Sequence, residues 1–268
     1  MDYVIYYLQI LLYSLGAMVV CGLAVWACQR LFIHLMGGGV GYKIVLGTSI
    51  IGTPVHEIGH ALMCLVFGHR ISKIVLWQPR SEDGTLGYVA HTWNGRNLFH
   101  NLGNIFIGVG PIFSGVIVIS LCLYYGFPGT FAAYVAGAES LVNSGAGVQA
   151  FLLEGIEIIP NLIGEFTNES FPIWGRILLI IAMLCVSLHI NLSPADIKGS
   201  LSGIPVYLGL TLVLTITSHL AGTSAMADVL DTLKLYNGYM MAMFTLVFVF
   251  SVVQVLVALM VWLLRKIF

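Results

Sequence analysis

The sequence predicts an all-α polytopic membrane protein with about six transmembrane helices and a small β-hairpin after the second helix. Hydrophobic residues make up 59% of the 268 residues and charged residues only 9%, whereas soluble domains have roughly 45–50% and about 25%. The mean hydropathy is +0.96. Apolar stretches of about 20 residues, long enough to cross a hydrocarbon core as helices, recur along the chain. We therefore expect a single membrane domain over residues 1–268.

Six stretches are predicted to span the membrane. The first is longer than one crossing requires, which indicates a tilted or protruding helix. Its N-terminus lacks the cationic region of a cleaved signal peptide, so we expect this helix to be retained. The expected spans are residues 4–35, 43–67, 98–125, 172–192, 204–221 and 239–264.

A different pattern lies between the second and third expected spans. Residues 71–77 alternate loosely between apolar and polar side chains, and residues 85–93 are rich in the Tyr, Val and Thr that favour strands. The intervening Ser81-Glu82-Asp83-Gly84 is typical of a turn. These features predict a β-hairpin over 71–93. An open sheet edge cannot face lipid, so the hairpin must lie in water, at the interface or against protein.

The segment 127–171 is apolar but is interrupted by glycine and asparagine. It contains five glutamates and neither lysine nor arginine. We expect one or two interfacial or re-entrant helices here, and a further span is the less favoured alternative.

The basic residues predict an orientation in the membrane. Short cytoplasmic loops carry an excess of Lys and Arg, and three regions together carry seven of the eleven basic residues: the hairpin region, the loop after the fourth expected span and the C-terminus. With six spans, both termini are then expected in the cytoplasm. The net charge of −1 and the lack of a basic cluster argue against nucleic acid as a partner. The basic residues of these three regions are Arg70, Lys73, Arg80, Arg96, Lys198, Arg265 and Lys266.

The second expected span contains the motif His56-Glu57-Ile58-Gly59-His60. Residues four apart share a helix face, so the two imidazoles can bind one Zn²⁺ while Glu57 acts on a water at the metal. The short motif also arises by chance. Three ionisable groups in an apolar span, however, cost several kcal/mol unless they are paired or metal-bound. The alternative is a polar packing or proton-relay cluster, as in a transporter.

A catalytic zinc site usually has three protein ligands and one open position. Asp196 is the only carboxylate between Glu169 and Asp228, and it follows the fourth expected span. In the predicted topology, this carboxylate and the two histidines lie in the cytoplasmic half of the bilayer. We therefore predict a metal site formed by His56, His60 and Asp196, with a helix N-cap as the alternative role of Asp196.

Three segments resemble motifs of the site-2 protease family of intramembrane zinc metalloproteases. The His56–His60 motif matches that family's zinc motif, and residues 110–115 (Gly-Pro-Ile-Phe-Ser-Gly) resemble its Gly-Pro segment. Residues 191–194 (Asn-Leu-Ser-Pro), followed by Asp196, are similar to the motif that supplies its third ligand. In the family a glycine directly follows that aspartate, whereas here two residues intervene before Gly199. The resemblance covers a catalytic core of about residues 43–200, with 1–36 and 204–268 as additional helices.

The resemblance implies hydrolysis of peptide bonds in or near transmembrane segments of membrane-protein substrates within the lipid bilayer. It implies one Zn²⁺ per chain and Glu57 as the catalytic residue. The hairpin at 71–93 has a family counterpart that is thought to pair with an extended substrate strand. Asn191 would position the substrate, with a helix-end cap as its alternative role. No PDZ-like accessory domain is visible in the sequence, so regulation would come from a partner or from the segment 127–171.

Two other functions remain open from the sequence. A membrane transporter would need a polar path across the whole bilayer, whereas the ionisable residues in the spans gather in one half. A non-catalytic, zinc-binding pseudoprotease is disfavoured by the presence of Glu57. We expect His189 to be hydrogen-bonded inside the bundle and His91 to be an exposed strand residue. The cysteines are expected to act as small buried hydrophobes; they are Cys21, Cys28, Cys64, Cys122 and Cys185.

Overall fold

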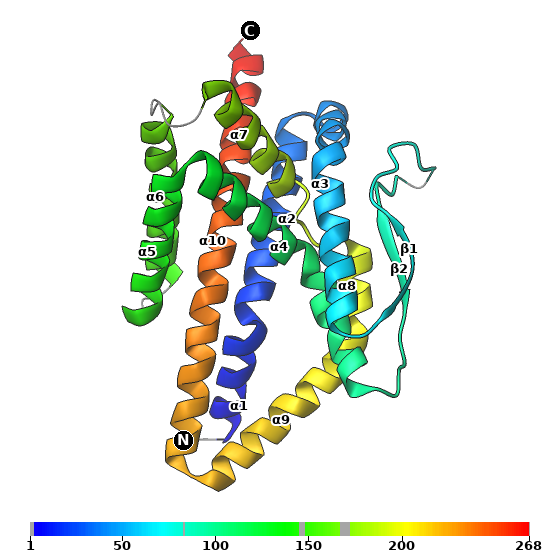
Figure 1. Cartoon of the computed structure of the whole chain (residues 1–268), viewed down its shortest axis with the longest axis vertical. Helices are drawn as coiled ribbons and strands as arrows, with labels where there is room; N and C mark the ends of the chain where they lie inside the picture. The colour runs from blue at the N-terminus through cyan, green and yellow to red at the C-terminus, as the bar shows by residue number, and fades with distance from the viewer. Residues whose placement is uncertain (1–2, 83, 145–147, 167–171, 268) are drawn as a thin grey trace.

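The computed structural model describes residues 3–82, 84–144, 148–166 and 172–267, and helices dominate them (Figure 1). The first part comprises α1 (Tyr3–Leu11), the π-helical η1 (Leu12–Gly16), α2 (Ala17–Leu35), α3 (Gly38–Val66), β1 (Arg70–Val75), β2 (Tyr88–Thr92) and α4 (Leu98–Gly126). The second part comprises α5 (Pro128–Ser144), α6 (Val148–Glu165), α7 (Ile173–Ser187), α8 (Pro194–Ser200), the 3₁₀-helical η2 (Leu201–Gly203), α9 (Ile204–Ala221) and α10 (Thr223–Ile267).

Five helical stretches among the described residues are long and apolar enough to cross a membrane. They identify the chain as an integral membrane protein that lies in a lipid bilayer, in agreement with the fold class expected from composition. The stretches are Met18–Leu35, Gly38–Val66, Leu98–Gly126, Pro194–Ala221 and Thr223–Ile267.

The fourth expected span, 172–192, is shorter in the structure. Its helix α7 has 15 residues, about 22 Å at 1.5 Å per residue, against a hydrocarbon core of about 30 Å. The helix ends at Ser187, and six residues further on Ser193, which precedes Pro194, is extended, with φ −73° and ψ 158°, before α8 begins. The chain then continues through α8, η2 and α9 in the same direction along the long axis (Figure 1).

This continuation affects the expected topology. The two spans expected at 172–192 and 204–221 form one passage along the molecule (Figure 1). As a result, the first turn of α1 and the last turn of α10 lie at opposite ends of the long axis (Figure 1). The fold therefore does not support the expectation that both termini share one side of the membrane.

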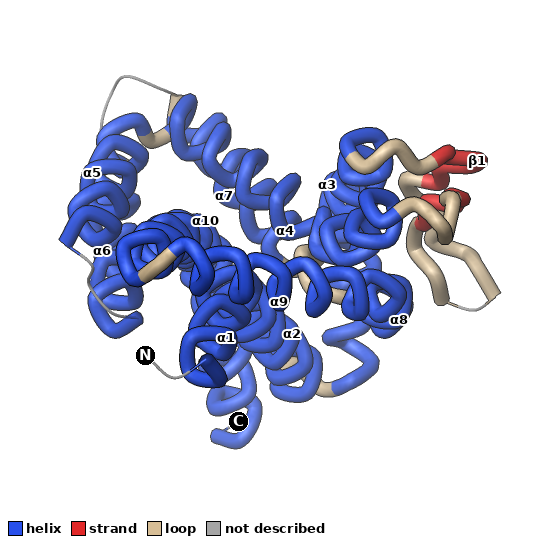
Figure 2. Tube along the Cα trace, turned by 90° about the horizontal axis from the view of Figure 1, so that it is seen from below, coloured by secondary structure: helices blue, strands red, loops and turns tan. Residues whose placement is uncertain are grey.

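Segment 127–171 forms two helices, α5 and α6, that pack against each other on the side of the bundle opposite the hairpin (Figure 2). Glu165 at the end of α6 connects the two helices. Its carboxylate accepts hydrogen bonds from the backbone N–H groups of Gly129 and Thr130 at the start of α5, both at 2.8 Å. This agrees with the expectation of one or two helices. Residues 145–147 and 167–171 lie outside the described part.

The expected β-hairpin is confirmed. Strands β1 and β2 pair antiparallel from Arg70↔Thr92 to Val75↔Tyr88, with a bulge between Ile71 and Lys73. The hairpin packs against α3, and the indole N–H of Trp77, just after β1, donates to Ser49 Oγ at 2.9 Å. The hairpin thus forms a wall beside the helix that carries the histidine motif (Figure 1).

The core that positions the site lies between α4, α7 and α10. Fully buried side chains such as Leu123, Val186 and Leu246 pack together there. Helix α3 approaches α4 closely, and Ser114 Oγ donates to the Val55 carbonyl at 2.8 Å. The close approach brings backbone carbonyls of α4 within reach of side chains on α3.

Gly59 permits this approach, and we expect Gly59→Ala to destabilise the protein. An added Cβ would lie 2.5 Å from the Gly110 carbonyl oxygen and from Ser114 Oγ, so one helix must shift. Overpacking of this kind costs roughly 1–3 kcal/mol. Gly47→Ala on the same helix is the matched control, because nothing lies within 4 Å of its added Cβ. Melting temperatures in detergent would measure both, and equal values for the two variants would contradict the prediction.

Candidate metal centre

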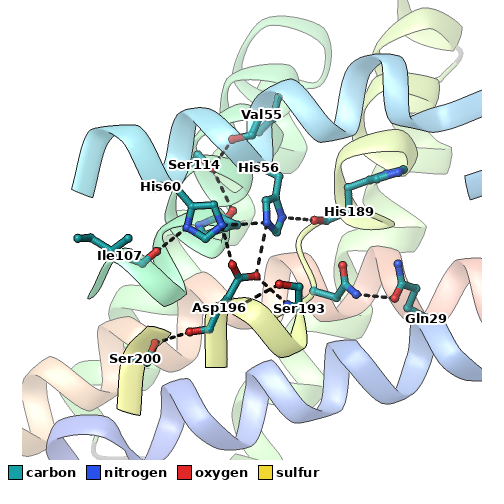
Figure 3. A network of polar contacts seen from close by, with 12 residues as sticks. Gln29, Val55, His56, His60, Ile107, Ser114, His189, Ser193, Asp196 and Ser200 are labelled. Carbon is teal, nitrogen blue, oxygen red and sulfur yellow. Dashed lines mark hydrogen bonds and ion pairs between the residues drawn. The ribbon is translucent and has the colours of Figure 1, made fainter. Parts of the chain in front are cut away.

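The two histidines of the motif lie one turn apart on α3 and point to the same side (Figure 3). His56 Nδ1 lies 2.7 Å from the His189 carbonyl, and His60 Nδ1 lies 2.7 Å from the Ile107 carbonyl. A carbonyl only accepts, so both Nδ1 atoms carry the proton in the neutral rings. Each Nε2 therefore presents a lone pair, the arrangement found in metal-binding histidines.

Asp196 completes the group. Its Oδ1 lies 3.1 Å from His60 Nε2 and its Oδ2 lies 3.7 Å from His56 Nε2, and the two Nε2 atoms are 3.0 Å apart. Ligands about 2.0 Å from a tetrahedral ion are separated by about 3.3 Å. Facing lone pairs beside a carboxylate form a group that can hold a metal ion. The three predicted ligands His56, His60 and Asp196 are thus brought together in a geometry that fits one metal ion.

The orientation of Asp196 is set by the start of α8. The Ser193 N–H donates to Asp196 Oδ2 at 2.7 Å, and the Asp196 N–H donates to Ser193 Oγ at 3.1 Å, which together form a capping box. From the sequence, helix capping and metal binding were alternative roles for Asp196. In the structure, its carboxylate caps α8 and also lies beside the two imidazoles. Capping restricts the side chain, so the Asp196 carboxylate is positioned before any metal binds.

Glu57 lies beside these ligands and is 5% exposed. It lines a cavity of about 820 Å³ together with His56, His60 and Asp196. The connection between the two strands covers it: a Cβ added at Gly87 would lie 2.9 Å from Glu57 Cγ. The carboxylate is thus placed beside the candidate metal position and partly shielded from bulk solvent.

Asn191 lines the same cavity, and its side chain is hydrogen-bonded to Gln29, which the sequence analysis did not single out. Asn191 Nδ2 donates to Gln29 Oε1, and Gln29 Nε2 donates in turn to the Leu188 carbonyl at 2.9 Å. The sequence feature that could have identified Gln29 is its position as a polar residue inside the first apolar span.

His189 is buried and supports the site without contributing a ring nitrogen to it. Its Nδ1 lies 2.9 Å from the Cys185 carbonyl and its Nε2 lies 3.2 Å from the Val45 carbonyl, so the expectation of a histidine bonded within the bundle is confirmed. Its carbonyl oxygen holds His56 (Figure 3). Gly52 makes room for the ring, because an added Cβ there would overlap it.

Comparisons with known proteins identify no relative. No protein-family model, curated protein or solved structure matches the chain. The chemistry of the site is therefore argued from its geometry. Two imidazoles and a carboxylate converge on one point, a second carboxylate lies next to them, and all four line one cavity within an apolar helical bundle.

Proposed function

We propose that the protein is an intramembrane zinc metalloprotease that hydrolyses peptide bonds in or near transmembrane segments of membrane proteins. The observation that carries the proposal is the convergence of His56 Nε2, His60 Nε2 and the Asp196 carboxylate, with Glu57 on the same cavity wall. Three ligands of this type leave a fourth position open for a water or a substrate oxygen. The resemblance to site-2 proteases supports the same function.

The residues divide the work of peptide hydrolysis. When bound, Zn²⁺ would acidify a water and polarise the scissile carbonyl. Glu57 accepts a proton from the attacking water and delivers it to the leaving amine, so that hydroxyl adds to the acyl carbon and hydrogen to the nitrogen. His189 and Ile107 keep the two imidazoles in the ligating tautomer through their carbonyl groups.

The cavity indicates how a substrate would be presented. A transmembrane helix bonds its own carbonyl groups internally, so a substrate must be locally extended before hydrolysis. Residues 86–89 of the hairpin line the same cavity as the ligands, and an extended segment could pair with this backbone as an added strand. Asn191 also lines the cavity and would bind the substrate backbone through its side-chain carbonyl, because its amide donates to Gln29.

Proteolysis can be tested before any substrate is identified. Cells expressing the wild-type protein should accumulate membrane-protein fragments with new N-termini in or beside transmembrane segments, detected by N-terminal labelling and mass spectrometry. A matched culture expressing His60→Ala should lack these fragments, because the metal site loses a ligand. Identical sets of N-termini in the two cultures would contradict the proposal and favour the transporter or pseudoprotease alternatives.

A further inference from the structure

A second group of metal-ligating side chains lies where α3 ends and the hairpin begins. Cys64 follows His60 by four residues and so lies on the same face of α3, one turn further on. His69 follows the end of the helix, and His91 lies on β2. One ligand atom from each of these three residues lies within 4.8 Å of the others. The sequence predicted a buried hydrophobe at Cys64 and an exposed strand residue at His91.

The backbone holds two of these residues together. Helix α3 ends in a Schellman motif at Gly68, whose φ is +69°. The His69 N–H donates to the Cys64 carbonyl at 2.8 Å and the Gly68 N–H donates to the Leu65 carbonyl at 3.2 Å. The turn returns the chain over the last turn of the helix. Cys64 and His69 are thus neighbours for a reason independent of any ligand.

His69 is held by a backbone carbonyl, as are the two histidines of the first site, but through its other ring nitrogen. Its Nε2 lies 2.9 Å from the His100 carbonyl and must donate there, so its Nδ1 presents a lone pair. That lone pair faces His91 Nδ1 at 3.0 Å. Burial lowers the pKa of both imidazoles from the ordinary histidine value. Neutral rings oriented by a carbonyl are the form in which histidine binds metals.

From this geometry we infer that Cys64, His69 and His91 bind a second Zn²⁺. A thiol and two imidazoles are a ligand set that zinc favours over the hard cations Mg²⁺ and Ca²⁺. Binding releases the thiol proton, and the thiolate then offsets one of the two positive charges of the ion. A hydrogen bond between His69 and His91 accounts for two of the three groups, but it leaves the fully buried Cys64 sulfur beside them without a role.

This second ion would connect the hairpin to the end of α3 through metal–ligand bonds. His91 lines the same cavity as His60 and Glu57, and Trp93 next to it stacks on His69 with 5.7 Å between ring centroids. Among the described residues, β2 would then be held to α3 through a metal at this end, while Trp77, just after β1, connects the hairpin to α3 through its hydrogen bond to Ser49. The site would thus fix one wall of the cavity, whether or not the protein is a protease.

Cobalt substitution distinguishes the two sites. Only the second site contains sulfur, so only it can give the near-ultraviolet thiolate-to-cobalt charge-transfer band when the purified protein is loaded with Co²⁺. We expect this band in the wild type and in Asp196→Ala, and its loss in Cys64→Ala. Cys122→Ala, which removes a thiol from α4, is the matched control and should keep the band.

Metal content gives a second measurement. Elemental analysis of the purified protein should find two zinc ions per chain in the wild type and one in Cys64→Ala, His91→Ala and Asp196→Ala. His91→Ala changes a strand residue, so it covers the outcome in which Cys64→Ala does not fold. Wild-type protein without the cobalt band, or Cys64→Ala with unchanged zinc content, would overturn the second site. Either result would leave the first site and the proposed proteolysis unaffected. A wild-type protein that shows the band but cleaves no substrate would contradict the proposed proteolysis and leave the second site standing.

Discussion

Glu57→Gln is expected to reduce peptide-bond cleavage by roughly 10²–10⁴-fold, the usual contribution of a general acid–base group. The amide has nearly the same size and shape as the carboxylate, but it cannot accept a proton from the attacking water. Glu57 is not one of the three residues whose ligand atoms converge, so the zinc content of Glu57→Gln should equal that of the wild type. Initial rates on a peptide containing a cleavage site found by N-terminal labelling, with zinc measured on the same sample, would test both parts.

The control for this prediction is a carboxylate far from the cavity. Asp231 is exposed, with 73% of its side chain accessible, and is paired with Lys234. Asp231→Asn should therefore cleave at the wild-type rate, because it removes the same charge without touching the site. A Glu57→Gln variant that cleaves as fast as this control would refute the role of Glu57 as the general base.

The fold could be predicted in outline because membrane helices are specified by composition and length. The boundaries of α4, the end of α3 and the presence of the hairpin follow from apolar runs and strand-forming residues, whereas α3 begins at Gly38, five residues before the expected start. The role of α7 could not be predicted in the same way. An apolar run of this length can be a span or a helix buried among others, and periodicity does not separate the two. The break after Ser187 is accompanied by contacts from other helices, since Gln29 Nε2 donates to the Leu188 carbonyl and His189 Nε2 lies 3.2 Å from the Val45 carbonyl.

The ligands of the first site could be predicted because their chemistry is encoded in side chains. His56 and His60 share a helix face, and Asp196 is the one nearby carboxylate in its part of the chain. The groups that orient them could not be predicted, since the His189 and Ile107 acceptors are backbone carbonyls on other elements. The Cys64 group was missed because its members come from a helix, a turn and a strand, and only the Schellman turn and strand pairing bring them together.

Asp196→Asn should lower zinc affinity at the first site much more than Ser193→Ala, although both changes affect the same capping box. The asparagine carbonyl oxygen can still accept the Ser193 N–H, so the start of α8 is kept, but the negative charge that faces both Nε2 atoms is lost. Ser193→Ala removes the hydroxyl that accepts the Asp196 N–H. It should cost about 1 kcal/mol of stability, and at most the roughly 10–100-fold in metal affinity typical of groups that orient a ligand.

Competition with a chelating dye would measure both affinities, and thermal unfolding would measure both stabilities. The two readouts separate the roles that the sequence left as alternatives for Asp196. A ligand role predicts that Asp196→Asn loses metal but, with metal removed from all samples, unfolds at the wild-type temperature. A pure capping role predicts the opposite order for the two variants. Equal metal affinities in Asp196→Asn and Ser193→Ala would show that the carboxylate acts through the helix start, and the candidate centre would then be reduced to its two histidines.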